Sequence, residues 1–148
     1  MAANPNDGMG TSALDAEAIQ ALVTSMRGPV LRPGDPAYDE TRTIQNGLID
    51  RRPGLIARCT GAADVIAAVG FARQHGLLLS VRGGGHNVAG NAVCDGGLMI
   101  DLSAMRGVHV DPRARIALVQ GGATWGDLDR ETQVFGLATP GGVVSTTG

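Results

Sequence analysis

Residues 55–102 read LIARCTGAADVIAAVGFARQHGLLLSVRGGGHNVAGNAVCDGGLMIDL. Three short apolar runs in this stretch have the length and composition of buried strands, and they cover residues 55–59, 77–81 and 98–102. Between the first two, Thr60 can cap a helix that continues through Phe71 to His75, and Gly76 can end it. The order strand, helix, strand predicts a β-α-β unit followed by a third strand.

The flanking segments add helices and a hairpin. Apolar residues at helical spacing predict a helix over residues 12–27 with Ser12 as its cap, whereas residues 28–53 appear irregular apart from a turn near Tyr38. Downstream we expect a hairpin around Asp-Pro and then a helix capped by Thr124 and ended by Gly136. The chain is therefore predicted to be α+β, a small mixed sheet flanked by helices. Its expected divisions are a tail and helix over 1–28 and one domain over 29–148.

All twelve basic residues are arginine, and the sequence contains no lysine. This absence excludes a Walker A loop and a pyridoxal Schiff base, since both require a lysine amine. A formal net charge of −2 gives no basic surface for DNA or RNA, so no nucleic-acid partner is expected. The hydrophobic fraction of 43% against a charged fraction of 18% favours a packed core over disorder.

Cys59 and Cys94 are the only cysteines, which excludes a disulfide framework and a multi-cysteine zinc site. The three histidines show no spacing typical of metal ligands, so no metal is expected. The N-terminus does not resemble a secretory signal, and no run of 18 apolar residues could span a membrane. We therefore expect a cytoplasmic protein without a membrane partner.

The glycine-rich loop from Arg82 to Gly90 follows the second predicted strand. Ligands of α/β proteins usually bind at this end of a strand, and successive N–H groups of such a loop can form an anion-binding nest. The dinucleotide-binding fingerprint would require glycine at position 88, which is valine. The loop therefore predicts phosphate binding by another arrangement, with His86 exposed to a ligand because three glycines precede it.

Four motifs in register carry a resemblance to a known family. RGGGH begins at Arg82, and the later motifs cover residues 95–102, 121–129 and 136–148. Their order resembles the N-terminal flavin-binding segment of berberine bridge enzyme-like oxidases, within the vanillyl-alcohol oxidase/p-cresol methylhydroxylase (PCMH) group. The resemblance covers about residues 30–148 and implies the first subdomain of a PCMH-type FAD-binding domain.

The resemblance implies that FAD is the cofactor and that the His86 imidazole bonds to its 8α-methyl carbon. It places residues 82–87 on the phosphate side and residues 144–148 near the isoalloxazine ring. The cofactor-binding residues it implies are Arg82, Gly83, Gly84, Gly85, His86, Asn87, Gly90, Val144, Ser145, Thr146 and Gly148.

Doubly linked members of the family carry a cysteine at the position of Val144, so we expect one covalent bond, through His86, instead of two. The full enzyme would move a hydride from a small-molecule C–H or C–OH to flavin N5, with dioxygen as a possible electron acceptor. The family's catalytic base and substrate pocket come mostly from later parts of the chain, so no catalytic residue is expected here.

Two other functions remain open. The sequence stops after Gly148 in an apolar, glycine-rich segment without a helix cap, and the chain could be a truncated, inactive nucleotide-binding remnant. A weaker hypothesis is a small thiol hydrolase that uses Cys94 with His86 as its base. Further coding sequence after Gly148 would favour the oxidase, and an immediate stop would favour the remnant.

Overall fold

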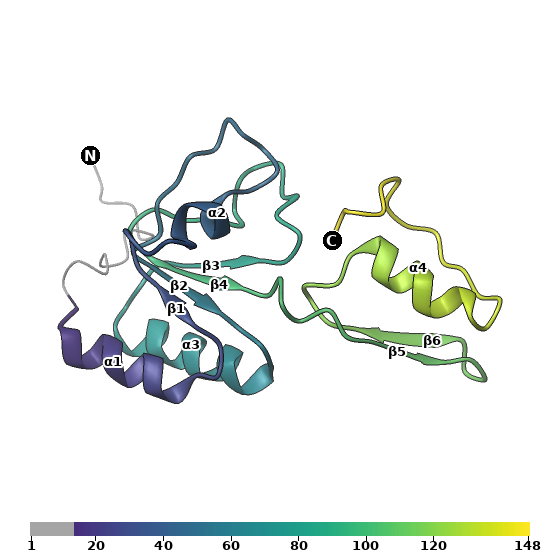
Figure 1. Ribbon diagram of the computed structural model, residues 1–148, viewed down its shortest axis with the longest axis horizontal. Coiled ribbons are helices and arrows are strands. Elements are labelled where there is room, and N and C mark those ends of the chain that lie inside the picture. The colour runs from purple at the N-terminus through teal and green to yellow at the C-terminus, as the bar shows by residue number, and fades with distance from the viewer. Residues whose placement is uncertain (1–13) are drawn as a thin grey trace.

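The structure is a computed structural model that describes residues 14–148, arranged in two lobes (Figure 1). The first lobe contains a four-stranded sheet with helices, and the second contains a two-stranded hairpin and one helix. The helices are α1 (Ala16–Ser25), α2 (Tyr38–Arg42), α3 (Ala62–Gln74) and α4 (Trp125–Gln133). The strands are β1 (Val30–Leu31), β2 (Leu55–Arg58), β3 (Leu79–Arg82), β4 (Leu98–Asp101), β5 (Val108–Asp111) and β6 (Ile116–Val119).

The four-stranded sheet has the order β1-β2-β4-β3. β2, β4 and β3 run parallel, which confirms the β-α-β unit and shows that β4 lies between its two strands. β1 pairs antiparallel with β2, so the prediction that residues 28–53 are irregular was wrong over these two residues. The predicted turn near Tyr38 is α2. The fold is thus a small mixed sheet flanked by helices, as the sequence predicts.

Alternate residues of the buried strands face opposite sides of this sheet, as the pleat of a strand requires. Leu55 and Ala57 pack in a core with α1 and α3, whereas Ile56 packs on the other face with the fully buried Tyr38. Ile19 of α1 belongs to the first core. The helix in the predicted segment 1–28 therefore shares its core with the sheet.

The N-termini of two helices differ from the prediction. Asp15 caps α1 through its side chain, and Ser12 lies outside the described residues. α3 begins after Gly61 instead of Thr60. Thr60 donates from its N–H and its hydroxyl to Asp64, a buried carboxylate that also accepts N–H groups from the end of α1.

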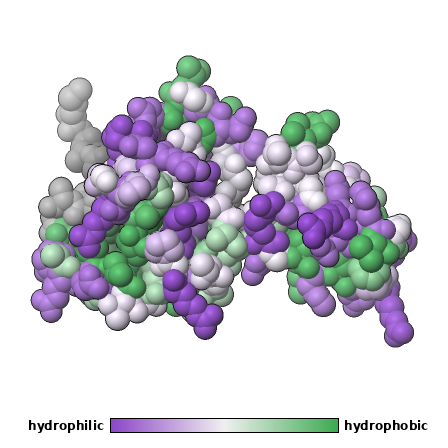
Figure 2. All heavy atoms as spheres, in the orientation of Figure 1, coloured by the Kyte–Doolittle hydropathy of each residue, from purple (hydrophilic) through white to green (hydrophobic). Residues whose placement is uncertain are grey.

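The second lobe confirms the predicted hairpin, β5–β6, and the helix capped by Thr124. The N–H and hydroxyl of Thr124 both donate to Asp127, and a bidentate ion pair joins Asp127 to Arg106. Hydrophobic residues reach the surface of this lobe (Figure 2), among them Ile116 and Leu118 of β6. In the described part of the chain, no helix has the length and apolar character needed to cross a membrane.

Candidate cofactor site

The glycine loop leaves the sheet at the carboxyl end of β3, the position that the sequence predicts. Gly85 has a φ of +74°, a conformation that L side chains rarely adopt, and it is buried. Its carbonyl accepts a hydrogen bond from the Gln45 N–H at 3.1 Å, which ties the loop to the segment after α2. The loop is therefore held at Gly85, directly before His86.

The backbone N–H groups of this loop lack partners within the protein. Among residues 14–148, no hydrogen bond is made by the N–H groups from Gly83 to Ala89. Buried or half-buried N–H groups nearly always have a partner, so the four free donors from Gly83 to His86 form a site for an anion or for water, whereas residues 87–89 are exposed. The geometry suits the diphosphate of a dinucleotide cofactor.

Gly83 and Gly84 also allow other parts of the chain to pack closely against the loop. A Cβ atom at Gly84 would lie 2.6 Å from the backbone nitrogen of Gly148, and one at Gly83 would overlap the carbonyl oxygen of Gly121. The glycine loop and the C-terminal segment, which the resemblance assigns to the same cofactor, are therefore in direct backbone contact. Gly121 packs against the loop at Gly83, and the sequence marked it only as the first residue of the motif over residues 121–129.

The C-terminal segment is fixed in this place by the first turn of α4. The N–H groups of Trp125 and Gly126, which an isolated helix would leave without partners, donate to the carbonyls of Thr147 and Ser145 at 2.8 Å. Residues 144–147 form a turn closed by a further hydrogen bond of 3.0 Å. Val144, Ser145, Thr146 and Gly148 are exposed.

His86 lies at the junction of the two segments. Its Cδ2 atom is 3.3 Å from the position that a Cβ at Gly84 would take, so the imidazole stands beside the contact of Gly84 with Gly148. The ring is half-buried, and no described residue makes a hydrogen bond with it. His86 is thus partly accessible, and its imidazole makes no hydrogen bond with residues 14–148.

The other predicted residues of the loop maintain its shape. The Asn87 side chain accepts the Asn91 N–H at 3.0 Å, which closes a local turn. Gly90 has a φ of +74° and packs against Ile49, and its carbonyl accepts a hydrogen bond from the Arg51 guanidinium. Asn87 and Gly90 therefore define where the loop ends.

Arg82 does not face outward along the loop. Its Nη1 donates to Asp101 at 3.0 Å, and its Nε is buried without a hydrogen-bond partner among the described residues. Asp101 also accepts the Arg58 Nε, and sequence reasoning assigned no function to either residue. The sequence did carry a signal for these two residues, because Asp101 ends the apolar run LMID and Arg58 ends the apolar run LIAR.

Cys94 lies in a different environment from His86. Its thiol is buried, accepts the Ser80 hydroxyl at 3.3 Å and donates toward the carbonyls of Leu78 and Leu98. Burial raises the pKa of the Cys94 thiol, which lowers the thiolate fraction that a nucleophile needs. These contacts argue against the thiol hydrolase hypothesis. Within the described residues, no three His, Cys, Asp or Glu side chains gather where a metal ion could bind.

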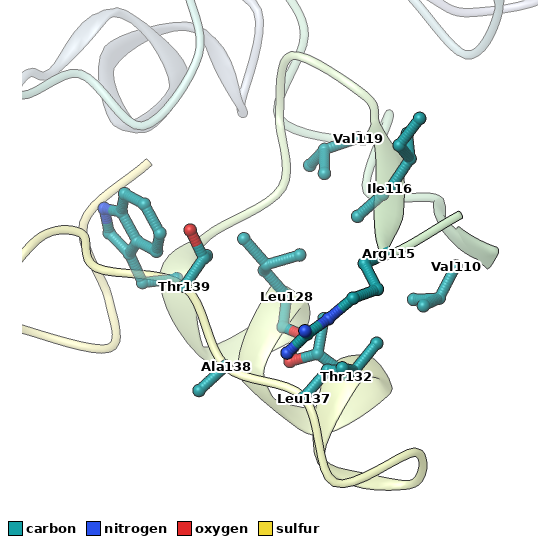
Figure 3. Close-up of a pocket in the computed structure, with 11 residues that line it drawn as sticks. Val110, Arg115, Ile116, Val119, Leu128, Thr132, Leu137, Ala138 and Thr139 are labelled. Atoms are coloured by element: carbon teal, nitrogen blue, oxygen red, sulfur yellow. The ribbon is translucent and has the colours of Figure 1, made fainter. Parts of the chain in front are cut away.

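A cavity of about 400 Å³ lies in the second lobe, between the hairpin, α4 and residues 137–139 (Figure 3). The Arg115 side chain extends across it toward Leu128 and Thr132 of α4. None of the cofactor-binding residues that the resemblance implies lines it. The chemistry predicted from the glycine loop is therefore separate from this cavity.

Comparison with known proteins identifies the family. A family model described as an FAD binding domain matches residues 53–148, and this match includes the glycine loop, Gly121 and the C-terminal segment. The chain belongs to this family of FAD-binding domains. Its structural neighbours are flavoenzymes with a PCMH-type FAD-binding domain.

Individual relatives agree with this assignment. The chain is 42% identical to (R)-6-hydroxynicotine oxidase of Paenarthrobacter nicotinovorans over 123 residues, which are 83% of this chain and 27% of the relative. The crystal structure of 6-hydroxy-D-nicotine oxidase from Arthrobacter nicotinovorans superposes with a TM-score of 0.80 at 42% identity, covering 84% of this chain and 27% of that one. For BBE-like 1 of Physcomitrella patens the TM-score is 0.81 at 27% identity, covering 88% and 29%. The chain thus spans less than a third of the length of these relatives.

Proposed function

We propose that this chain binds FAD with its diphosphate on the glycine loop and anchors it through a single covalent bond to His86. The observation that supports this most directly is that the N–H groups from Gly83 to Ala89 and the side chain of the half-buried His86 make no hydrogen bond with residues 14–148. Free donors attract the diphosphate, and the adjacent imidazole nitrogen is available as a nucleophile.

The residues of the glycine loop fit an FAD molecule, because their N–H groups make no hydrogen bond with residues 14–148 and are free to bind its diphosphate. The N–H groups of residues 83–87 would hold the diphosphate, and residues 144–148 would lie beside the ring system because they contact Gly84. FAD, when bound, supplies a two-electron acceptor at N5 and an 8α-methyl carbon open to attack. The His86 imidazole would contribute the nitrogen of the new N–C bond. The imidazole N–H and one methyl C–H would be lost, and dioxygen would take up these two protons and two electrons as hydrogen peroxide.

Only one bond is proposed because the second position cannot form one. Val144, which stands where doubly linked relatives carry a cysteine, has no sulfur and is 54% exposed in the turn of the C-terminal segment. Cys94 is buried beside Ser80 and donates toward Leu78 and Leu98, so it is not positioned to replace that cysteine. His86 is then the sole anchor.

For the whole protein, we propose oxidation of a small-molecule C–H or C–OH with hydride transfer to flavin N5 and dioxygen as the electron acceptor. Residues 29–148 would form the N-terminal part of its FAD-binding domain, after a tail and helix over 1–28. This chain would contribute cofactor binding and no catalytic residue, because it corresponds to less than a third of its relatives.

Incubation of the purified chain with FAD, followed by acid denaturation and gel electrophoresis, tests the anchor. We expect a fluorescent wild-type band that is absent from H86A and retained in H109A, since His109 is an exposed residue of β5 far from the loop in sequence. Equal fluorescence of the wild-type and H86A bands would refute the anchor. Reversible FAD binding without attachment would instead support the nucleotide-binding remnant.

A further inference from the structure

Three charged side chains stand side by side at the carboxyl ends of three parallel strands. Asp101 of β4 is in register with Arg58 of β2 on one side and with Arg82 of β3 on the other. Its carboxylate accepts the Arg58 Nε at 3.2 Å and the Arg82 Nη1 at 3.0 Å. The Asp101 side chain is 1% exposed, so this ionic bridge is shielded from water.

The carboxylate of Asp101 has no free acceptor position. Ser103 donates to it twice, from its N–H at 3.1 Å and from its hydroxyl at 2.8 Å. With two donors on each oxygen, the orientation of the carboxylate is fixed, and it fixes in turn the guanidinium of Arg82. The two arginines also outnumber the one carboxylate, which leaves a net positive charge beneath the glycine loop.

Arg82 supports the loop from inside. Its Nε lies 3.4 Å from the position that a Cβ at Gly85 would take, and the Cα of Ile44 lies 3.6 Å from the same point. Gly85 is thus enclosed between Arg82 and the segment after α2. His86 is the next residue along the chain, so the contact between Arg82 and Gly85 lies directly before the residue that carries the imidazole.

We propose that Asp101 is a positioning residue for flavin attachment, acting through Arg82 and Gly85 on the direction of the His86 imidazole. This inference rests on the proposed function, since it requires His86 to be the anchor. Asp101 itself does not touch the cofactor in this account. A near-attack geometry requires the nucleophile to be placed within a fraction of an ångström, so loss of the bridge slows bond formation more than it weakens reversible binding.

The test compares two buried carboxylates, each replaced by its amide in the full 148-residue chain. D101N breaks the bridge under the loop, whereas D64N removes a carboxylate that is equally buried but bonded to Arg27, Gly28 and Thr60. We expect D101N to slow covalent incorporation of FAD, followed by the mass of the denatured chain, at least about tenfold. D64N should change this rate by less than about threefold at a comparable loss of stability, on the same argument.

Two further readouts separate positioning from a general loss of structure. Reversible FAD binding before attachment, measured by quenching of flavin fluorescence, should change by less than about threefold in D101N, because the N–H groups of the loop remain. The ¹⁵N relaxation of Gly85 and His86 should show a more mobile loop in D101N than in D64N, without FAD present. If D101N does not fold, S103A, which removes one donor to Asp101, should slow incorporation about twofold to fivefold.

Each outcome decides between the two proposals. Absence of flavin on the wild-type chain refutes the anchor, and with it this inference. If flavin attaches to the wild type and D101N, or S103A where D101N does not fold, attaches it at the same rate, the inference is refuted and the anchor stands. Equal slowing by D101N and D64N also refutes it, because the effect would then follow stability.

Discussion

Replacement of Gly84 by alanine tests the contact that brings the two cofactor segments together. The added Cβ would lie 2.6 Å from the nitrogen and 2.8 Å from the Cα of Gly148. Ordinary van der Waals contact begins at 3.4 Å, so the two backbones must separate by about 0.8 Å. Gly84 has no positive φ, and the cost is therefore steric and not conformational.

Overpacking of this kind destabilises by about 1–3 kcal/mol when neither side can yield. We expect G84A to lose up to about 3 kcal/mol of unfolding free energy in urea, or to lose less if the C-terminal segment moves away from the loop. If the C-terminal segment moves away, FAD attachment should fall, because the distance between His86 and residues 144–148 changes. The assays are urea unfolding and flavin fluorescence of the denatured band.

Gly47 provides the matched control, because a Cβ added there meets nothing within 4 Å and its φ is not positive. G47A should match the wild type in stability and flavin attachment. If G84A also matches the wild type in both measurements, the close contact between Gly84 and Gly148 does not support the site, and the reasoning is wrong.

Three further perturbations have defined outcomes. Burial alone would raise the pKa of Asp64, but the N–H groups of Arg27 and Thr60 lower it from 3.8 to about 2. This shift contributes about 2 kcal/mol of stability at neutral pH, which is lost as the pH falls below about 4. D64N should therefore lose less stability in acid unfolding. T124A removes the hydroxyl that donates to Asp127 and should cost about 1 kcal/mol in urea unfolding. Cys94 should resist iodoacetamide until the chain unfolds, and fast labelling of the native chain would contradict its burial.

The elements that sequence reasoning recovered are those with a local pattern. Continuous apolar runs predicted β2, β3 and β4 because buried parallel strands need apolar side chains on both faces. β1 was not predicted because it has only two residues, within a segment bounded by Pro29 and Pro33, and its pairing depends on β2, which is distant in sequence. Thr60 was the best local cap, yet α3 begins after Gly61 because Asp64 collects donors 36 and 37 residues away.

In the candidate site, too, the local features could be predicted from the sequence and the long-range contacts could not. The RGGGH motif is contiguous, so its position at the end of β3 could be predicted from the chain itself. The contacts that organise it are not contiguous, since Gly121 and Gly148 reach the loop only through the packing of α4 and the C-terminal segment. Asp101 was visible only as a charge ending an apolar run, and its meaning depends on the strand register.

Locating the flavin on the chain is the most direct test of whether His86 is the anchor. Trypsin cleaves after arginine, so the three histidines fall on three different peptides, residues 74–82, 83–106 and 107–113. After incubation with FAD, digestion and mass spectrometry, the added mass of one flavin should appear only on peptide 83–106 and fragment to His86. A flavin on either of the other peptides, or unmodified peptides from a chain that has bound FAD, would contradict the proposed anchor.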